Sequence, residues 1–367
     1  MSTFSVTVER LTIREHPNAD KLELAEVGDY QAIVRKGQFK TGDLAAYIPE
    51  QAVMPSVLLK EMGLDGKLAG KLKNRVKAVR LRGILSQGLV YPAREEWQEG
   101  TDVTDILGIT KWEPPIPAHL SGEVFAAGQE RTLKYDIENF KRYPHLLEEG
   151  EQVVFTEKLH GTWCMIGLMP PKYAHPTEGR LIVSSKGLSS RGLAMKIESE
   201  NNKTNLYVRV ARHYKMDNRI SFAFGHQLKD EEDPKPVYVL GEVFGSGVQD
   251  LAYGSSASKD EDIGFRVFDI YVGRPGTGRY LDDAELDASC KRLGLTRVPV
   301  LYRGPFTKEV MNKFTDGFET ISGKELHIRE GIVIRPTTER RCDEIGRVQL
   351  KSVSGDYLTR KGGTEFN

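Results

Sequence analysis

Short alternations of apolar and polar residues dominate the first third of the chain. Residues 4–13 (FSVTVERLTI) alternate along most of their length, which is typical of a strand with one buried face. Similar short runs follow, separated by Gly, Asp and Pro, at residues 22–27, 30–37, 43–49 and 76–92. A helical pattern at residues 56–64 interrupts them. Several short strands with one helical interruption predict a small Greek-key barrel over residues 1–105.

The pattern then changes. Residues 106–130 contain a Pro- and Gly-rich stretch without periodicity, and we interpret them as a linker. Residues 131–150 indicate a helix followed by a turn. The remainder combines apolar strands with two clear helical stretches, residues 199–215 and 280–294, and the second ends in a glycine suited to a helix C-terminus. Residues 131–367 are therefore predicted to form an α+β domain with central antiparallel sheets and helices outside.

Length and composition limit the classes of protein that fit. A chain of 367 residues is long for one hydrophobic core, so two domains are expected. Lys and Arg together number 52, as do Asp and Glu, so any nucleic-acid surface must be local. Three widely spaced cysteines form no metal-binding pattern and are expected to be reduced thiols in the cytoplasm. Because the chain has no signal peptide and no apolar stretch of about 18 residues, we expect no membrane contact.

One local basic stretch stands out within the predicted barrel. It spans residues 67–82, contains no acidic residue and carries seven cations, which are Lys67, Lys71, Lys73, Arg75, Lys77, Arg80 and Arg82. A basic strand or loop on such a barrel predicts a surface that binds nucleic-acid phosphates. The alternative is a solvated basic edge that discourages pairing with another sheet.

A lysine followed three residues later by a glycine points to chemistry in the second half. Lys158–Gly161 has this pattern, but alone it is weak evidence, because Lys60, Lys67 and Lys291 have it too. Later strands support it, since each brings a polar or aromatic group near one end: Lys186 or Arg191, Glu242, Phe268, Glu330 and Lys351. Strands that return to a common core can gather such groups in one pocket. Cations, two carboxylates and an aromatic ring suit a nucleoside triphosphate with a divalent metal.

The order of these motifs resembles that of the covalent nucleotidyltransferases, which include DNA ligases, RNA ligases and mRNA capping enzymes. The chain is most similar to ATP-dependent RNA ligases with an N-terminal OB-like module. Lys158-Leu-His-Gly161 stands at the nucleophile motif, and either Lys186 or Arg191 stands at the second. Two positions depart from the usual pattern: Thr162-Trp163 stands where an asparagine is common, and Gln349 stands where the last motif often has a lysine. The resemblance implies an ATP-grasp-like ligase core behind the barrel.

The N-terminal part carries a second resemblance. Residues 13–27 (IREHPNADKLELAEV) are similar to the opening of tRNA-binding OB domains attached to aminoacyl-tRNA synthetases. The resemblance implies an OB-like domain that grips nucleic acid beside the break.

The resemblance to RNA ligases also implies a role for each motif residue. Lys158 would attack ATP and carry AMP, and the adenylate would pass to an RNA 5′-phosphate before a 3′-hydroxyl seals the break. Glu330 would hold Mg²⁺ or Mn²⁺, and the residues expected around the nucleotide are Glu157, Gly161, Lys186, Arg191, Glu242, Phe268 and Lys351. Among these, Phe268 would stack on adenine, Glu242 would accept a ribose hydroxyl and Glu157 would face the base edge. For His160 we expect a structural role.

Several readings of function stay open at this point. We expect an RNA ligase that acts as a monomer in RNA repair on a nicked or broken duplex. A DNA ligase is the nearest alternative, and a capping guanylyltransferase is more distant. The OB-like domain precedes the catalytic domain here, whereas the usual DNA ligase has it afterwards, which favours RNA. A nucleic-acid-binding protein with a degenerate catalytic half is the alternative outside the enzymes.

Overall fold

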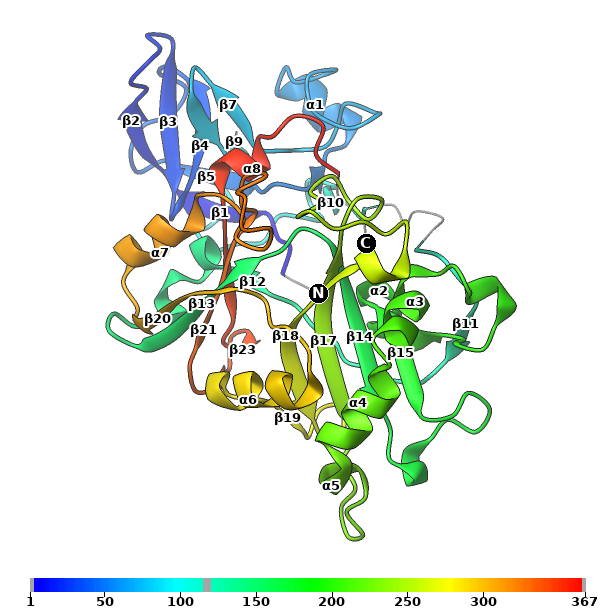
Figure 1. Cartoon of the computed structure of the whole chain (residues 1–367). Helices are drawn as coiled ribbons and strands as arrows, with labels where there is room; N and C mark the ends of the chain where they lie inside the picture. The colour runs from blue at the N-terminus through cyan, green and yellow to red at the C-terminus, as the bar shows by residue number, and fades with distance from the viewer. Residues whose placement is uncertain (1–2, 115–119, 365–367) are drawn as a thin grey trace.

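The computed structural model describes residues 3–114 and 120–364, and it contains a small β-barrel beside a larger domain built on two sheets (Figure 1). The barrel consists of two three-stranded antiparallel sheets. One joins β1 (Thr7–Arg10), β5 (Leu44–Ile48) and β9 (Leu89–Pro92), and the other joins β2 (Thr12–Glu15), β3 (Leu22–Val27) and β4 (Tyr30–Arg35). The predicted alternation is realised, since Val6 and Val8 are fully buried.

Smaller elements complete the barrel. A short hairpin pairs β7 (Val79–Leu81) with β8 (Ile84–Ser86), and α1 (Ser56–Glu61) falls within the predicted helical interruption. The strand β6 (Ala52–Val53) pairs with β10 (Thr110–Lys111). This last pair ties the first residues of the predicted linker to the barrel.

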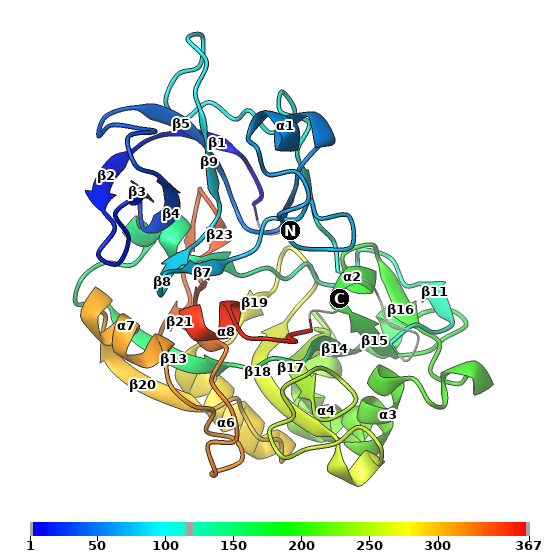
Figure 2. The same ribbon diagram turned by 90° about the horizontal axis from the view of Figure 1, so that it is seen from above.

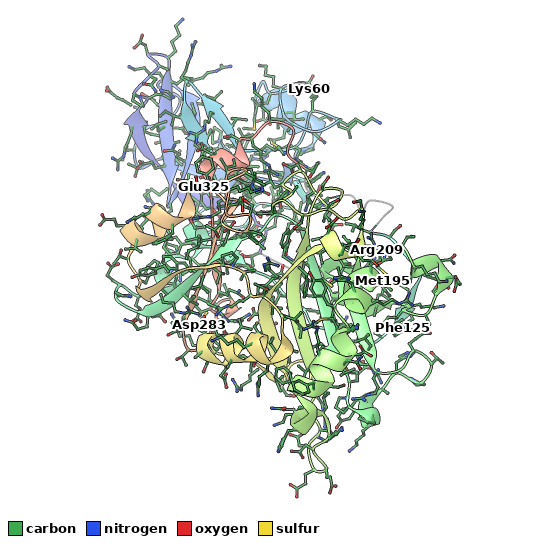
Figure 3. All side chains as sticks on the ribbon, in the orientation of Figure 1. Lys60, Phe125, Met195, Arg209, Asp283 and Glu325 are labelled. Carbon is green, nitrogen blue, oxygen red and sulfur yellow. The ribbon has the colours of Figure 1, made fainter. Side chains whose placement is uncertain are left out.

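The other end of the predicted linker joins the larger domain. There β11 (Val124–Ala126) pairs with β16 (Leu193–Met195), and Figure 3 labels Phe125 and Met195 on these neighbouring strands. Residues 115–119 of the linker lie outside the described residues. The division at residues 105 and 130 therefore stays a prediction, since both flanks of this segment take part in sheets.

The larger domain is organised around two five-stranded sheets (Figure 2). The first has the order β12 (Glu138–Asn139), β24 (Leu350–Val353), β21 (Gly331–Pro336), β13 (Gln152–Lys158) and β20 (Val300–Pro305). The second has the order β15 (Leu181–Ser185), β14 (Thr162–Leu168), β17 (Val237–Phe244), β18 (Gly264–Val272) and β19 (Arg279–Tyr280). All these strands pair antiparallel except β12 with β24. Two short strands, β22 (Arg341–Cys342) and β23 (Gly346–Arg347), form a separate hairpin.

Helices of the larger domain pack around these sheets. They are α2 (Lys186–Ser189), α3 (Leu206–His213), α4 (Met216–Ala223), α5 (Gly225–Leu228), α6 (Asp283–Leu293), α7 (Lys308–Thr315) and α8 (Gly355–Leu358). Of these, α3, α4 and α6 cover one face of the second sheet. Tyr207 on α3, Ile220 on α4 and Leu286 on α6 are fully buried in one core with apolar residues of β14, β17 and β18. No helix in the described part of the chain has the length and apolar character needed to span a membrane.

Local signals explain where the helices start and stop. A capping box of Asp282 and Glu285 opens α6, and Gly294 ends it with a positive φ of 62°, as the sequence predicted. The helix predicted over residues 199–215 is shorter, because Asn205 caps α3 with its side chain and leaves only a 3₁₀ turn before it.

The helix predicted within residues 131–150 is wrong. This segment contains β12, paired in parallel with β24, followed by two 3₁₀ turns at Phe140–Arg142 and Pro144–Leu146. A proline inside the stretch and the pairing with a distant strand outweigh its local helical pattern.

Candidate active site

Strand pairing places the predicted nucleophile beside the predicted metal ligand. Lys158 ends β13 and pairs with Gly331, the first residue of β21, so Glu330 comes just before that strand. The distance from Lys158 Nζ to Glu330 Oε1 is 2.6 Å, and both side chains are largely buried. The second carboxylate oxygen of Glu330, Oε2, is buried and accepts no hydrogen bond from the described residues. The site therefore contains a buried carboxylate oxygen that no described residue engages.

The same sheet brings the last predicted cation to this face. Thr156 pairs with Val333, and Val333 pairs in turn with Lys351. Side chains directly opposite each other in a sheet share a face, so Thr156, Val333 and Lys351 point to the same side. Lys158 lies two residues beyond Thr156 and therefore points to this side too. Burial, together with the charges of Lys158 and Lys186, lowers the pKa of Lys351 to about 8. Three cations therefore converge on one place.

Glu157 lines the cavity beside Lys158. Its oxygen Oε2 accepts hydrogen bonds from the backbone N–H and the hydroxyl of Thr320, at 3.0 and 2.6 Å. Its other oxygen, Oε1, is buried and has no hydrogen-bond partner among the described residues. Burial raises the pKa of Glu157 despite the bonds from Thr320. The expected contact of Glu157 with the base edge stays a prediction.

Gly161 is required by the close approach of β17. A Cβ added to Gly161 would lie 2.1 Å from the carbonyl oxygen of Val243, a distance that real side chains do not tolerate. The backbone N–H of Gly161 donates to the carboxylate of Glu242. Burial raises the pKa of Glu242, Lys158 opposes this rise and Glu330 supports it, and the pKa that results is about 8. The glycine therefore allows the nucleophile loop to contact the strand that carries Glu242.

A β-bulge turns Phe268 toward the cavity. In the β17–β18 ladder, Leu240 pairs with Asp269 and Gly241 pairs with Val267, so Phe268 is the extra, unpaired residue. Bulges of this kind reorient a side chain and are frequent near active sites. The Phe268 ring lies 5.3 Å from the Tyr135 ring, which lies 6.1 Å from that of Trp163. The three rings form an aromatic wall.

The structure distinguishes the two residues considered for the second motif. Lys186 follows β15, lines the cavity and forms an ion pair with Asp136 at 2.8 Å. Arg191 is exposed, donates to the carbonyl oxygen of Gly187 at 3.0 Å, and is not among the described residues that line the cavity. Lys186 is therefore the cation that this motif places in the site.

The cavity has a volume of about 450 Å³ and lies between the two domains. Lys158, Glu242, Phe268, Glu330 and Lys351 all line it. The barrel side adds residues that the sequence analysis missed, which are Tyr30, Glu50 and Lys111. Lys111 lies on a two-residue strand without a motif, so no local signal could have identified it.

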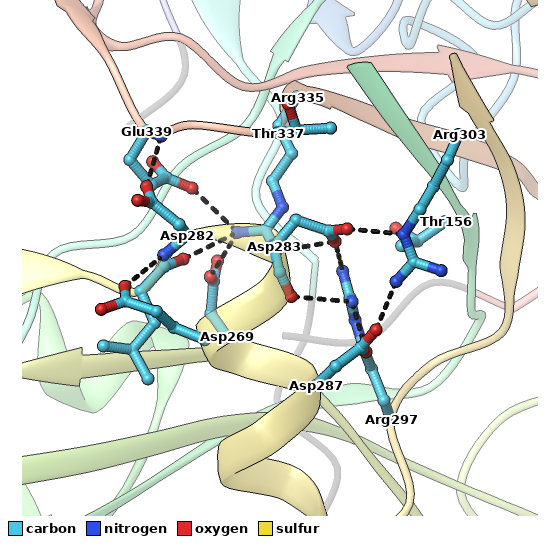
Figure 4. Close-up of polar contacts among 12 residues, drawn as sticks. Thr156, Asp269, Asp282, Asp283, Asp287, Arg297, Arg303, Arg335, Thr337 and Glu339 are labelled. Carbon is cyan, nitrogen blue, oxygen red and sulfur yellow. Dashed lines mark hydrogen bonds and ion pairs between the residues drawn. The ribbon is translucent and has the colours of Figure 1, made fainter. Parts of the chain in front are cut away.

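Buried ion pairs support the cavity floor (Figure 4). Asp269 is fully buried and contacts Arg335 at 3.1 Å and Arg347 at 2.6 Å. Asp283 at the start of α6 binds Arg297 and Arg303, each at 2.6 Å. Arg335 itself lines the cavity, so this network joins the wall of the site to the helix layer.

The basic stretch on the barrel is less continuous than predicted. Lys71, Lys73 and Arg82 are exposed. Arg75, in contrast, is buried with its guanidinium 3.6 Å from the centre of the Trp112 ring, and this burial removes it from the surface. Arg80 forms an ion pair with Asp356 of the larger domain at 2.7 Å.

Comparison with solved structures gives matches along nearly the whole chain, among them several structures of an RNA ligase of Naegleria gruberi at 25% identity. A lysine-to-alanine variant of that enzyme with ATP and Mn has a TM-score of 0.74 and covers 97% of this chain and 98% of its own. An apo aspartate-to-alanine variant has a TM-score of 0.75 and covers 98% of both. A lysine-to-methionine variant with AMP and Mn has a TM-score of 0.74, covering 96% and 97%.

Comparison with sequence families agrees with this. No curated protein matches the chain. A model of an OB-fold domain matches residues 5–93, and a model of the RNA ligase family matches residues 151–353. The predictions of an N-terminal OB-fold domain and of an RNA ligase are confirmed. Because the RNA ligase model spans more than half of the sequence and contains the whole set from Lys158 to Lys351, the chain belongs to the RNA ligase family.

Proposed function

We propose that this protein seals RNA 5′-phosphate and 3′-hydroxyl ends with ATP, through an AMP covalently bound to Lys158. The observation that carries the proposal is the position of the Lys158 amine, 2.6 Å from Glu330 in a cavity that also contains Glu242 and Lys351. The Naegleria gruberi enzyme of the same family has been solved with ATP, with AMP and with pyrophosphate. ATP is the substrate of lysine adenylylation, pyrophosphate is its leaving group, and AMP is the group that the lysine keeps.

The first step requires a free amine aligned with the α-phosphate. An ammonium group has no lone pair, so Lys158 must break its contact with Glu330 and lose a proton to solvent before it attacks. Lys186 and Lys351 would neutralise the phosphates while pyrophosphate leaves. Formation of the Nζ–P bond and cleavage of the α–β anhydride transfer AMP to the enzyme.

The residues fit a divalent cation bound together with the nucleotide. The described residues contain no group of three or more His, Cys, Asp or Glu side chains arranged for a metal. Mg²⁺ and Mn²⁺ are commonly held by one or two carboxylates plus phosphates and water, and the buried, unpaired Oε2 of Glu330 offers such a ligand. The cation would supply charge neutralisation on the phosphates.

The remaining residues would hold the adenosine. Phe268 would stack on the adenine, a contact worth roughly 1–3 kcal/mol by comparison with other base–aromatic pairs. Glu242 lies where its carboxyl group can bond a ribose hydroxyl. Gly161 would let the nucleotide approach the backbone of the nucleophile loop. Glu157, which lines the cavity, would face the base edge, whereas Arg191 takes no part in nucleotide binding in this proposal.

The OB-fold domain would bind the RNA beside the break. The cations proposed for its phosphates are Lys67, Lys71, Lys73, Lys77, Arg80 and Arg82. We propose that a nicked or broken duplex is the substrate, that the protein acts as a monomer and that it works in the cytoplasm. The last point is supported by its three cysteines, which are free thiols.

Labelling with [α-³²P]ATP and Mg²⁺ or Mn²⁺ tests the proposal. The wild-type protein should retain label through denaturing electrophoresis, and Lys158→Ala should not. Lys291→Ala is the matched control, because Lys291 starts another K-x-x-G tetrapeptide on the exposed side of α6. Absence of label on the wild-type protein under varied metals and pH would contradict the proposal.

Sealing assays with defined ends separate RNA from DNA ligation. Nicked duplexes with a ribose or a deoxyribose at the 3′-hydroxyl should be compared at equal enzyme concentration. We expect faster sealing with the ribose end. Equal or faster sealing of duplexes with deoxyribose ends on both strands would show that the protein is a DNA ligase instead.

A further inference from the structure

We propose that the C-terminal segment Ser354–Thr364 is a positioning element for the nucleophile. This inference rests on the proposed function of Lys158 and deepens it. The segment lies beyond residue 353, where the match to the RNA ligase family ends. It begins with the short helix α8, and two of its residues, Tyr357 and Leu358, line the cavity.

The first contact joins α8 to the residue two positions after the nucleophile. The hydroxyl of Tyr357 and Nδ1 of His160 share a hydrogen bond of 2.8 Å, and both side chains are buried. The backbone N–H of His160 donates to the hydroxyl of Tyr253 at 2.7 Å. His160 is therefore held through both its ring and its backbone.

Asp250 connects the histidine to the end of the segment. One of its oxygens, Oδ1, lies 2.7 Å from His160 Nε2 and accepts from the backbone N–H and the hydroxyl of Thr364, each at 2.8 Å. The other oxygen accepts from Arg360 Nε at 2.9 Å. The Arg360 guanidinium also lies 3.8 Å from the centre of the Tyr357 ring. Burial alone would raise the pKa of Asp250, but the bonds from His160 and Arg360 hold it well below its usual range.

These contacts leave the nucleophile loop little freedom. Gln249 beside Asp250 donates to the carbonyl oxygen of Gly161, so residues 159–161 are fixed by the 249–253 loop on one flank and by α8 on the other. Lys158 is the last residue of β13, and the direction of its side chain depends on the loop that follows. In-line attack is sensitive to displacements of about 1 Å, so a loop held in this way favours the reaction.

The segment also contacts the OB-fold domain. Arg80 on β7 pairs with Asp356 on α8 at 2.7 Å, and Figures 1 and 2 both show α8 beside β7. The two side chains are 40% and 65% exposed, so this ion pair contributes little energy. The strong contacts of the segment are those with His160 and Asp250, and they are the ones to test.

Two variants test the proposal in the full-length protein. Tyr357→Phe removes one hydroxyl and keeps the ring, and Asp250→Asn weakens the bonds to His160 and Arg360. Both should slow single-turnover formation of lysyl–AMP at saturating ATP, by roughly fivefold for Tyr357→Phe and by more for Asp250→Asn. The KM for ATP should change little, because neither residue is proposed to touch the nucleotide.

A second readout distinguishes positioning from a general structural defect. RNA that already carries a 5′-adenylate can be sealed without attack by Lys158, so this step should stay within about twofold of wild type. Tyr302→Phe is the matched control, since it removes an exposed hydroxyl bonded to the carbonyl oxygen of Pro305 on β20, and Tyr302 is not among the described residues that line the cavity. It should leave both steps unchanged.

Two results would overturn the inference. One is lysyl–AMP formation at the wild-type rate in both variants, and the other is an equal loss in both steps. If Asp250→Asn does not fold, as judged by its thermal melting, the isosteric Tyr357→Phe decides alone. A wild-type protein that takes no label would refute the proposed function instead, so the two failures are distinguishable.

Discussion

Lys158 Nζ and Glu330 Oε1 lie 2.6 Å apart at the ends of two paired strands, so the nucleophile and the proposed metal ligand are direct partners. The paired carboxylate orients the amine, and the same carboxylate would hold a divalent cation once the nucleotide is bound. One side chain can thus serve both the resting and the reacting arrangement. The two roles make Glu330 the most informative acidic residue for mutation.

Glu330→Gln should lower the rate of lysyl–AMP formation by on the order of 100-fold, because it removes both the charge and a metal ligand. The label from [α-³²P]ATP measures the rate, and raising the Mn²⁺ concentration should restore part of it. Glu325→Gln is the control, since Glu325 is an exposed acid five residues away (Figure 3). Equal rates in the two variants would be evidence against a metal role for Glu330.

Gly161→Ala should abolish most of the labelling. The added Cβ would lie 2.1 Å from the carbonyl oxygen of Val243, so either the nucleophile loop or β17 must move. Gly225→Ala is a suitable control, because a Cβ there meets no atom within 4 Å. A Gly161→Ala protein that labels at the wild-type rate would show that the loop tolerates the displacement.

Glu242→Gln should stabilise the nucleotide-free protein in a pH-dependent manner. The pKa of Glu242 is raised to about 8, so the folded state holds a proton that the unfolded state loses near pH 4.5. Wild-type stability should therefore fall relative to the variant as pH rises from about 4.5 to about 8, by about 5 kcal/mol. Thermal melting of both proteins from pH 5 to 9 measures this difference, and a constant difference in Tm would contradict it.

Phe268→Ala should weaken ATP binding by about 1–3 kcal/mol, which corresponds to roughly 5- to 100-fold in KM. Phe268→Tyr should retain most of the affinity, because it keeps an aromatic face. The KM for ATP in the labelling reaction is the measurement. If Phe268→Ala leaves the KM unchanged, the bulge in β18 has a structural purpose only.

Asp269→Asn should destabilise the fold by roughly 3–5 kcal/mol, because it leaves Arg335 and Arg347 buried without their main counter-charge. Urea denaturation measures the loss. Asp260→Asn removes an ion pair with Arg209 that is half exposed on the Asp260 side, and it should cost less than about 1 kcal/mol. Similar losses of unfolding free energy in the two variants would contradict the conclusion that the buried network stabilises the fold more than an exposed ion pair does.

Much of the site could be named before the structure because its residues stand at the ends of apolar strands. Glu242, Glu330 and Lys351 each follow or precede such a run, and all three line the cavity with Lys158. Glu157 lines the cavity as well, and its contact with the base stays a prediction. Lys186 and Arg191 were indistinguishable in the sequence, since the choice depends on where α2 turns.

The amino-acid sequence alone was sufficient to predict the strands, the two kinds of domain and the series of motifs, because these depend on residues that are neighbours along the chain. Which side chains are buried, and which of them contact one another, depends instead on strand register and on contacts between segments hundreds of residues apart. For that reason Arg75 behind Trp112, Phe268 on its bulge, Lys111 in the cavity and Tyr357 against His160 emerged only from the folded chain.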